Sequence, residues 1–127
     1  MRESEVRTIT VGMEYIGAVL SVNHYMGRTP DGSQYVKKEA RQWMSDLGWL
    51  IKTAHIEDWK QPITVHLEGH FRDARSCPDL HNLLKCVCDG IQELTGLNDR
   101  GFQTATGEPE IDGNEEAELF ITITEAR

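Results

Sequence analysis

Hydrophobic and polar residues alternate in three stretches of the chain, which is the pattern of half-buried β-strands. These stretches cover residues 6–13, 63–71 and 117–125. Because successive side chains of a strand point to opposite faces, the apolar positions of the middle stretch would all face a core. Those positions are Ile63, Val65, Leu67 and Phe71. A shorter run at residues 102–106 predicts a fourth strand.

Two other stretches carry apolar residues at spacings of three and four, which indicates amphipathic helices. The first begins at Ser33 and stops before Pro62, a residue that cannot continue a helix. Its apolar stripe consists of Val36, Ala40, Trp43, Met44, Leu47, Leu50, Ile51 and Ala54. The second helix runs over residues 80–94 and ends at Gly96, since glycine is a common helix terminator.

Two segments lack either pattern and are expected to be loops. Residues 17–32 hold the turn signals Pro30 and Gly32, and residues 107–116 are acidic. The first loop is too polar for a mere connection, and its polar residues include Ser21, Asn23, His24, Tyr25 and Arg28. The element order β-α-β-α-β-β predicts an α+β fold with a small mixed sheet of about four strands and two main helices. We expect a single domain over residues 1–127.

Composition narrows the class of protein. The chain has 127 residues, of which 39% are hydrophobic and 27% charged, as in one soluble globular domain. No apolar run approaches the roughly 18 residues of a membrane span, and the charged start has no signal-peptide pattern, so a cytoplasmic protein is expected. Cys77, Cys86 and Cys88 are an odd number in one segment, which favours reduced thiols over a disulfide framework.

The formal net charge is −8, from 21 acidic and 13 basic residues. This sign disfavours a protein that coats nucleic acid through bulk charge. It leaves room for an enzyme with a local basic cleft, or for one whose carboxylates hold metal ions, because net charge averages over a whole surface.

The most informative polar residues lie on and around the second helix. Asn82, Lys85 and Asp89 form a polar stripe along it, and Asp79 stands at its start. Asp99 follows in a turn that would fold back beside the helix. Carboxylates from separate segments suit Mg²⁺, which activates water and neutralises charge on a phosphodiester. A lysine one turn beyond them would bind phosphate as a point charge.

Plainer interpretations of these residues remain open. Residues 76–79 match a capping box with Asp in the place of Glu, so that Asp79 would only cap the helix. Lys85 and Asp89 would then form an exposed ion pair of little energetic value. A soft-metal site on one helix face is a further alternative, with the ligands Cys77, His81 and Cys88.

Residues 78–91 and 97–99 resemble the signature of RusA-type Holliday-junction resolvases. This chain has PDLHNLLKCVCDGI and then LND, where the family has Asp-x-Asp-Asn-x-x-Lys-x-x-x-Asp-x-Leu and then Asp-Asp. Residues 21–25 with 27–29 are similar to the family's Asn-rich loop and the basic residues after it. Residues 63–70 resemble the strand before the family's site, and residues 118–125 resemble its terminal strand. The resemblance implies a homodimeric, Mg²⁺-dependent endonuclease of phage or bacterial origin. Such an enzyme cleaves branched DNA by attack of a metal-activated water on a phosphodiester.

The resemblance also implies roles for individual residues, and no small-molecule cofactor. Asp79, His81 and Asp99 would hold the metal and act in catalysis with a lysine that contacts the scissile phosphate, Lys85. Supporting residues would be Asn82, Asp89 and Asn98. His81 and Asn98 each stand where the family has Asp. Because imidazole is a softer, neutral ligand, Mn²⁺ would suit the site better than Mg²⁺; otherwise His81 acts as a general base or touches no metal.

Polar and basic residues outside the helix supply the candidates for DNA contact. They are Asn23, His24, Arg28, Lys37, Lys38, Arg41, Arg72, Arg75 and Arg100. If a dimer gathers them around the carboxylates, they would form the local basic cleft that the net charge hides. Two other classes stay open: a catalytically silent protein that binds DNA junctions with the same fold, and a small metal-binding regulatory protein. Cleavage of a four-way junction in Mg²⁺ and then Mn²⁺ separates the nuclease from the silent protein. The regulatory protein would bind metal and have no affinity for branched DNA.

Overall fold

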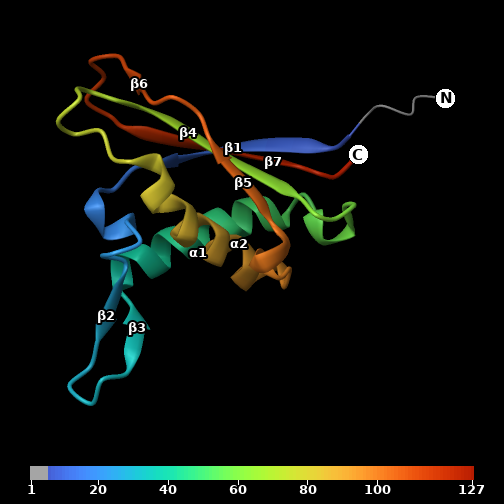
Figure 1. Ribbon diagram of the computed structural model, residues 1–127, viewed down its shortest axis with the longest axis horizontal. Coiled ribbons are helices and arrows are strands. Elements are labelled where there is room, and N and C mark those ends of the chain that lie inside the picture. Colours follow the sequence, from blue (N-terminus) through green and yellow to red (C-terminus); the bar gives the residue numbers. More distant parts are fainter. Residues whose placement is uncertain (1–5) are drawn as a thin grey trace.

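A mixed β-sheet forms one layer of the molecule, and two helices cover one of its faces (Figure 1). The computed structural model describes residues 6–127. Along the five-stranded sheet the order is β1 (Thr8–Glu14), β7 (Glu118–Thr124), β4 (Thr64–Phe71) and β5 (Gln103–Thr106), with β6 (Glu110–Ile111) paired to the end of β4. Strands β1, β7 and β4 are antiparallel neighbours, whereas β5 and β6 run parallel to β4. The predicted α+β class with a mixed sheet is therefore confirmed.

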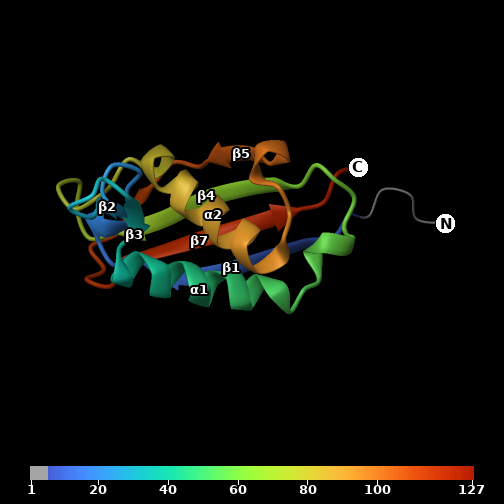
Figure 2. The ribbon, with the colours of Figure 1, turned by 90° about the horizontal axis from the view of Figure 1, so that it is seen from below.

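The two helices, α1 (Lys38–Lys52) and α2 (Leu84–Thr95), pack against each other on one face of the sheet and lie in front of the strands in Figure 2. Glycines permit this close approach: a Cβ at Gly48 would lie 2.6 Å from Cγ of Leu94, and one at Gly90 would lie 3.1 Å from the Met44 carbonyl oxygen. Helix α2 follows the 3₁₀ turn η3 (Leu80–Leu83). Within residues 6–127, every helix is too short or too polar to cross a membrane.

The core lies between the sheet and the helices, as the alternation of β4 predicts. The three apolar side chains of β4 are completely buried, as is Ile63 just before the strand, and β7 adds three more buried side chains on the same face. Those of β7 are Leu119, Ile121 and Ile123. Helix α2 ends at Gly96 in the left-handed conformation, with φ of 79°, which confirms the predicted terminator.

The predicted start of the first helix is wrong. The helix begins at Lys38 rather than Ser33, and residues 34–36 form strand β3 (Gln34–Val36). This strand pairs with β2 (Met26–Arg28) in a hairpin that projects from the body (Figure 1). The apolar Val36 fits the helical stripe in sequence, but it lies opposite Met26 in the hairpin. The segment expected to be a loop therefore contains β2 and also the 3₁₀ turn η1 (Ala18–Leu20).

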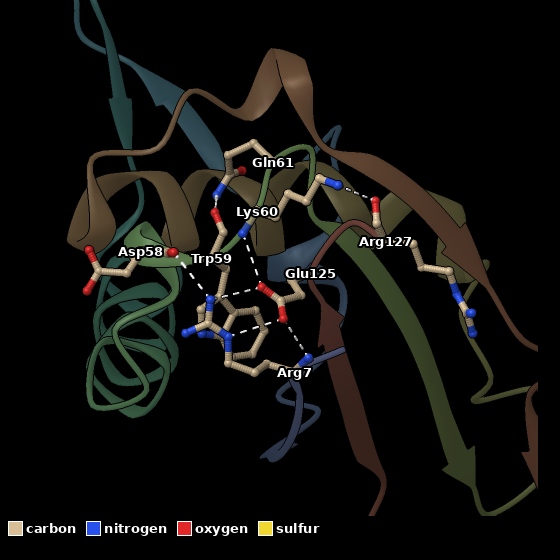
Figure 3. Close-up of polar contacts among 7 residues, drawn as sticks. All are labelled: Arg7, Asp58, Trp59, Lys60, Gln61, Glu125 and Arg127. Atoms are coloured by element: carbon tan, nitrogen blue, oxygen red, sulfur yellow. Dashed lines mark hydrogen bonds and ion pairs between the residues drawn. The ribbon is translucent and has the colours of Figure 1, made fainter. Parts of the chain in front are cut away.

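An ion pair joins the two terminal strands to the connection that follows α1 (Figure 3). Arg7 binds Glu125 with Nη2–Oε2 and Nε–Oε1 distances of 2.9 and 3.2 Å, and the guanidinium lies 5.6 Å from the centre of the Trp59 ring. The backbone N–H of Lys60 donates to Glu125 Oε2 at 3.1 Å. The hydrogen bonds from Arg7, followed by that from Lys60, lower the pKa of Glu125 to about 2. This connection also contains the 3₁₀ turn η2 (Ile56–Asp58).

Candidate functional site

Three charged side chains meet on the polar face of α2 and the turn beyond it. Lys85 Nζ lies 2.8 Å from Asp89 Oδ1 and 3.6 Å from Asp99 Oδ2. The ammonium thus lies between two carboxylates, and the hydrogen bond to Asp89 is the main cause that raises the pKa of Lys85. Lys85 and Asp99 therefore line one surface depression, and Asp89 pairs with the lysine from the same helix.

Asp99 reaches this position because the chain reverses after α2. Past Gly96 it forms the 3₁₀ turn η4 (Asp99–Gly101), whose N-cap Asn98 accepts a hydrogen bond from Arg100 N at 3.0 Å. The backbone N–H of Asp99 donates to Gln92 Oε1 at 2.8 Å and so attaches the turn to the helix. The turn folds back beside the helix, as the sequence predicts.

Asp79 and His81 form a second group at the start of the same segment. Asp79 is the N-cap of η3, and its Oδ1 accepts from the backbone N–H of His81 at 3.1 Å. His81 Nε2 lies 3.2 Å from Thr106 Oγ1 at the end of β5. Ser76 bonds instead to Asp73, so the predicted capping box is wrong, although Asp79 does cap.

The predicted metal ligands Asp79, His81 and Asp99 are divided between these two groups. Lys85 and Asp99 are in contact, and Asp79 contacts His81 through its backbone N–H. Within residues 6–127, no three His, Cys, Asp or Glu side chains are close enough to hold a metal ion by themselves. The donor atoms of Asp79, His81 and Asp99 are carboxylate oxygens and an imidazole nitrogen, which are ligands that divalent cations accept.

Tyr25 belongs to the site although the sequence analysis did not assign it there. Its Oη donates to Asp89 Oδ2 at 2.7 Å, and only 3% of the residue is exposed. Burial, followed by the hydrogen bond to Asp89, raises the pKa of Tyr25 well above its ordinary value. The available signal was an aromatic residue with a hydroxyl group in a loop whose other residues were mostly polar.

The predicted DNA-contacting residues come from several segments of the surface. All are exposed except Lys37, which is half-buried at the start of α1. Arg100 lies in η4, directly after Asp99. Some of these side chains are already paired, with Arg41 at 3.3 Å from Glu93 and Arg72 at 3.2 Å from its neighbour in the chain, Asp73. The others, Asn23, His24, Arg28, Lys38 and Arg75, lie on the hairpin and its approach, at the start of α1 and after β4.

The cysteines lend no support to a soft-metal site. Cys86 and Cys88 are buried in the core, and burial raises the pKa of each thiol to about 12. Within residues 6–127, neither thiol belongs to a group of three His, Cys, Asp or Glu side chains that could hold a metal ion. Their role in the described structure is to fill the space between α2 and the rest of the core.

The chain belongs to the RusA endodeoxyribonuclease family. Residues 17–124 match the family described as endodeoxyribonuclease RusA, a span that runs from the loop before η1 through β7. This confirms the resemblance seen in the motif around α2. No curated protein matches the sequence. The protein is thus an enzyme of a nuclease family, that of the Holliday-junction resolvases, and such nucleases are generally metal-dependent.

Proposed function

We propose that this protein cleaves four-way DNA junctions as a homodimer, with the help of a divalent cation. The observation that carries the proposal is the approach of Asp99 to Lys85, at 3.6 Å, on the helix face that bears the family motif. A carboxylate and a lysine are the groups needed beside a phosphodiester that is to be hydrolysed. In this protein they are brought together by the chain reversal after α2.

The cation would be held by Asp79, His81 and Asp99, with Asn82, Asp89 and Asn98 in support. Mg²⁺ usually keeps several waters and takes only one or two protein carboxylates together with substrate phosphates. A site with few protein ligands therefore suffices once DNA is bound. The cation would supply an activated water and neutralise negative charge on the phosphate oxygens.

The side chains around the cation have separate tasks. Lys85, charged and paired with Asp89, would bind the scissile phosphate as a point charge. His81 would act as a soft ligand or accept a proton. Its ring is positioned by the contact of Nε2 with Thr106 Oγ1 at 3.2 Å. Arg100 follows Asp99 in the same turn and would contact the neighbouring phosphate.

DNA would be bound by the nine predicted polar and basic residues. The net charge of −8 does not oppose this, because it averages over the whole surface and a dimer would gather these residues locally. A four-way junction has two-fold symmetry, so two equivalent sites in a dimer would make paired nicks. We expect a dimer by light scattering, and a monomer at micromolar concentration would contradict the model.

The three free thiols fit a reducing compartment such as the cytoplasm.

The test is cleavage of a synthetic four-way junction beside a linear duplex of the same sequence, first in Mg²⁺ and then in Mn²⁺. We expect paired nicks in the junction and none in the duplex. Lys85→Met should abolish the nicks, whereas the matched variant Lys52→Met should not, because Lys52 lies over Trp49 at the far end of α1. Cleavage of both DNAs alike, or an active Lys85→Met, would contradict the proposal.

A catalytically silent junction-binding protein is the second candidate. The observation that favours it is the lack, in the part of the chain that the structure describes, of three metal-ligating side chains in one place. His81 also stands where the family has a carboxylate. Tight junction binding with no nicks in either metal would select this candidate.

A further inference from the structure

We infer that Tyr25 is a positioning residue, which holds Asp89 so that the ammonium of Lys85 stays beside Asp99. The inference rests on the proposed nuclease function and adds to it a residue outside the motif around α2. Tyr25 comes from the loop before the β2–β3 hairpin, far from α2 in sequence, and it reaches Asp89 through its hydroxyl group.

The contacts of Asp89 form a chain of hydrogen bonds. Its Oδ2 accepts from Tyr25 Oη at 2.7 Å, and its Oδ1 accepts from Lys85 Nζ at 2.8 Å. A carboxylate turns easily about its last torsion, so one donor alone fixes it poorly. With the tyrosine in place, Oδ1 is held toward Lys85, whose ammonium lies 3.6 Å from Asp99 Oδ2.

The burial of Tyr25 leaves its contact with Asp89 as the route by which it would affect cleavage. With 3% of the residue exposed, Tyr25 is closed off from DNA and from solvent, whereas the side chain of Lys85 is 54% exposed. A contribution of the tyrosine hydroxyl to cleavage would therefore appear in the rate of the chemical step, while binding of the junction would keep its strength.

The backbone of Tyr25 joins the hairpin to the same site. The N–H of Lys37, just before α1, donates to the Tyr25 carbonyl at 2.8 Å, and Met26 beyond it begins β2. Three residues earlier, Val22 N donates to the Asn82 carbonyl at 2.7 Å. These two backbone hydrogen bonds hold the segment that carries Tyr25 against the start of α1 and η3.

The test compares Tyr25→Phe, which removes only the hydroxyl, with the matched control Tyr15→Phe. Tyr15 is half-buried and packs edge-on against Phe71, with ring centres 5.5 Å apart. We expect Tyr25→Phe to lower kcat for junction cleavage by about 10- to 100-fold, as loss of an outer partner typically does. The dissociation constant for the junction in EDTA should stay within about twofold, and Tyr15→Phe should match the wild type.

A double-mutant cycle distinguishes positioning from general loosening. In the background of Asp89→Ala, adding Tyr25→Phe should not lower the rate further, because the two residues act in series. Three results would each overturn the inference. They are a wild-type kcat in Tyr25→Phe, a loss that appears in junction binding, and effects that multiply in the double variant. Those results would leave the nuclease function intact as long as the wild type cleaves. An inactive wild type would overturn both.

Discussion

The ammonium of Lys85 lies 3.6 Å from the carboxylate of Asp99, although Lys85 is in the first turn of α2 and Asp99 follows the other end of the helix. The reversal at Gly96 and the hydrogen bond from Asp99 N to Gln92 make this approach possible. The centre of the site is therefore one helix and its own return turn. Tyr25 and the Thr106 contact of His81 bring in distant segments.

Changing His81→Asp should raise Mg²⁺-supported cleavage several-fold. The substitution restores the family's carboxylate, which is a hard oxygen donor and adds attraction for the cation even at an effective dielectric constant of about 20. Repulsion among carboxylates in the empty site opposes this gain, but millimolar Mg²⁺ offsets it. Nicking rates of both proteins in Mg²⁺ and Mn²⁺ provide the measurement, and the wild type should prefer Mn²⁺ more strongly.

His55→Asp is the matched control, because it adds the same charge at an exposed position beyond the end of α1. Its left-handed backbone, with φ of 54°, accepts aspartate. We expect wild-type cleavage from it. A folded His81→Asp protein that is slower in Mg²⁺ would show that His81 has a role of its own, such as general base.

The stability contributed by Glu125 should depend on pH. Hydrogen bonds from Arg7 and Lys60 lower the pKa of Glu125 from 4.5 to about 2. A depressed native pKa means that the stabilisation is fully present above the unfolded value and is lost as the pH falls through the native value. The difference in Tm between wild type and Glu125→Gln should thus be largest above about pH 5 and shrink toward pH 2.

The exposed Glu108 supplies a control for this comparison. Glu108→Gln should show a small difference in Tm that stays nearly constant over the same range. A constant difference for Glu125→Gln as well would contradict the assignment of its stabilisation to the Arg7 ion pair.

Thiol reactivity should separate the three cysteines. The thiolate is the reactive form. Burial raises the pKa of all three thiols, to about 12 for the buried Cys86 and Cys88, whereas Cys77 is only half-buried and open to a reagent. At pH 8 a thiol reagent should modify one residue of the native protein quickly and all three after unfolding in urea. Cys77→Ser should remove the fast phase. Rapid modification of Cys86 or Cys88 in the native protein would contradict their place in the core.

Local patterns in the sequence predict most of the fold, because burial repeats along each element. The alternation of β4 and the glycine after α2 are examples that the structure confirms. The start of α1 could not be predicted in this way, since Val36 fits a helical stripe as well as a strand. Its pairing with Met26 across the hairpin decides between them, and that pairing is not local.

The candidate site shows the same division. The stripe of Lys85 and Asp89 and the returning Asp99 follow from helical spacing and one turn. The contact of Tyr25 with Asp89 joins residues 64 positions apart, and no periodic pattern records it. It depends on how the N-terminal loop lies against α2, which only the packed structure defines.

The most direct test of the proposed function measures cleavage and binding on the same preparation of Asp99→Asn. The substitution removes a carboxylate and leaves every basic residue in place, so cleavage of a four-way junction should fall at least about 100-fold in Mg²⁺. Binding of the junction in EDTA should remain within about threefold of the wild type, because phosphate contacts by Lys and Arg dominate it. Asp79→Asn should behave alike. Equal loss of binding and cleavage, or cleavage at the wild-type rate, would contradict the account.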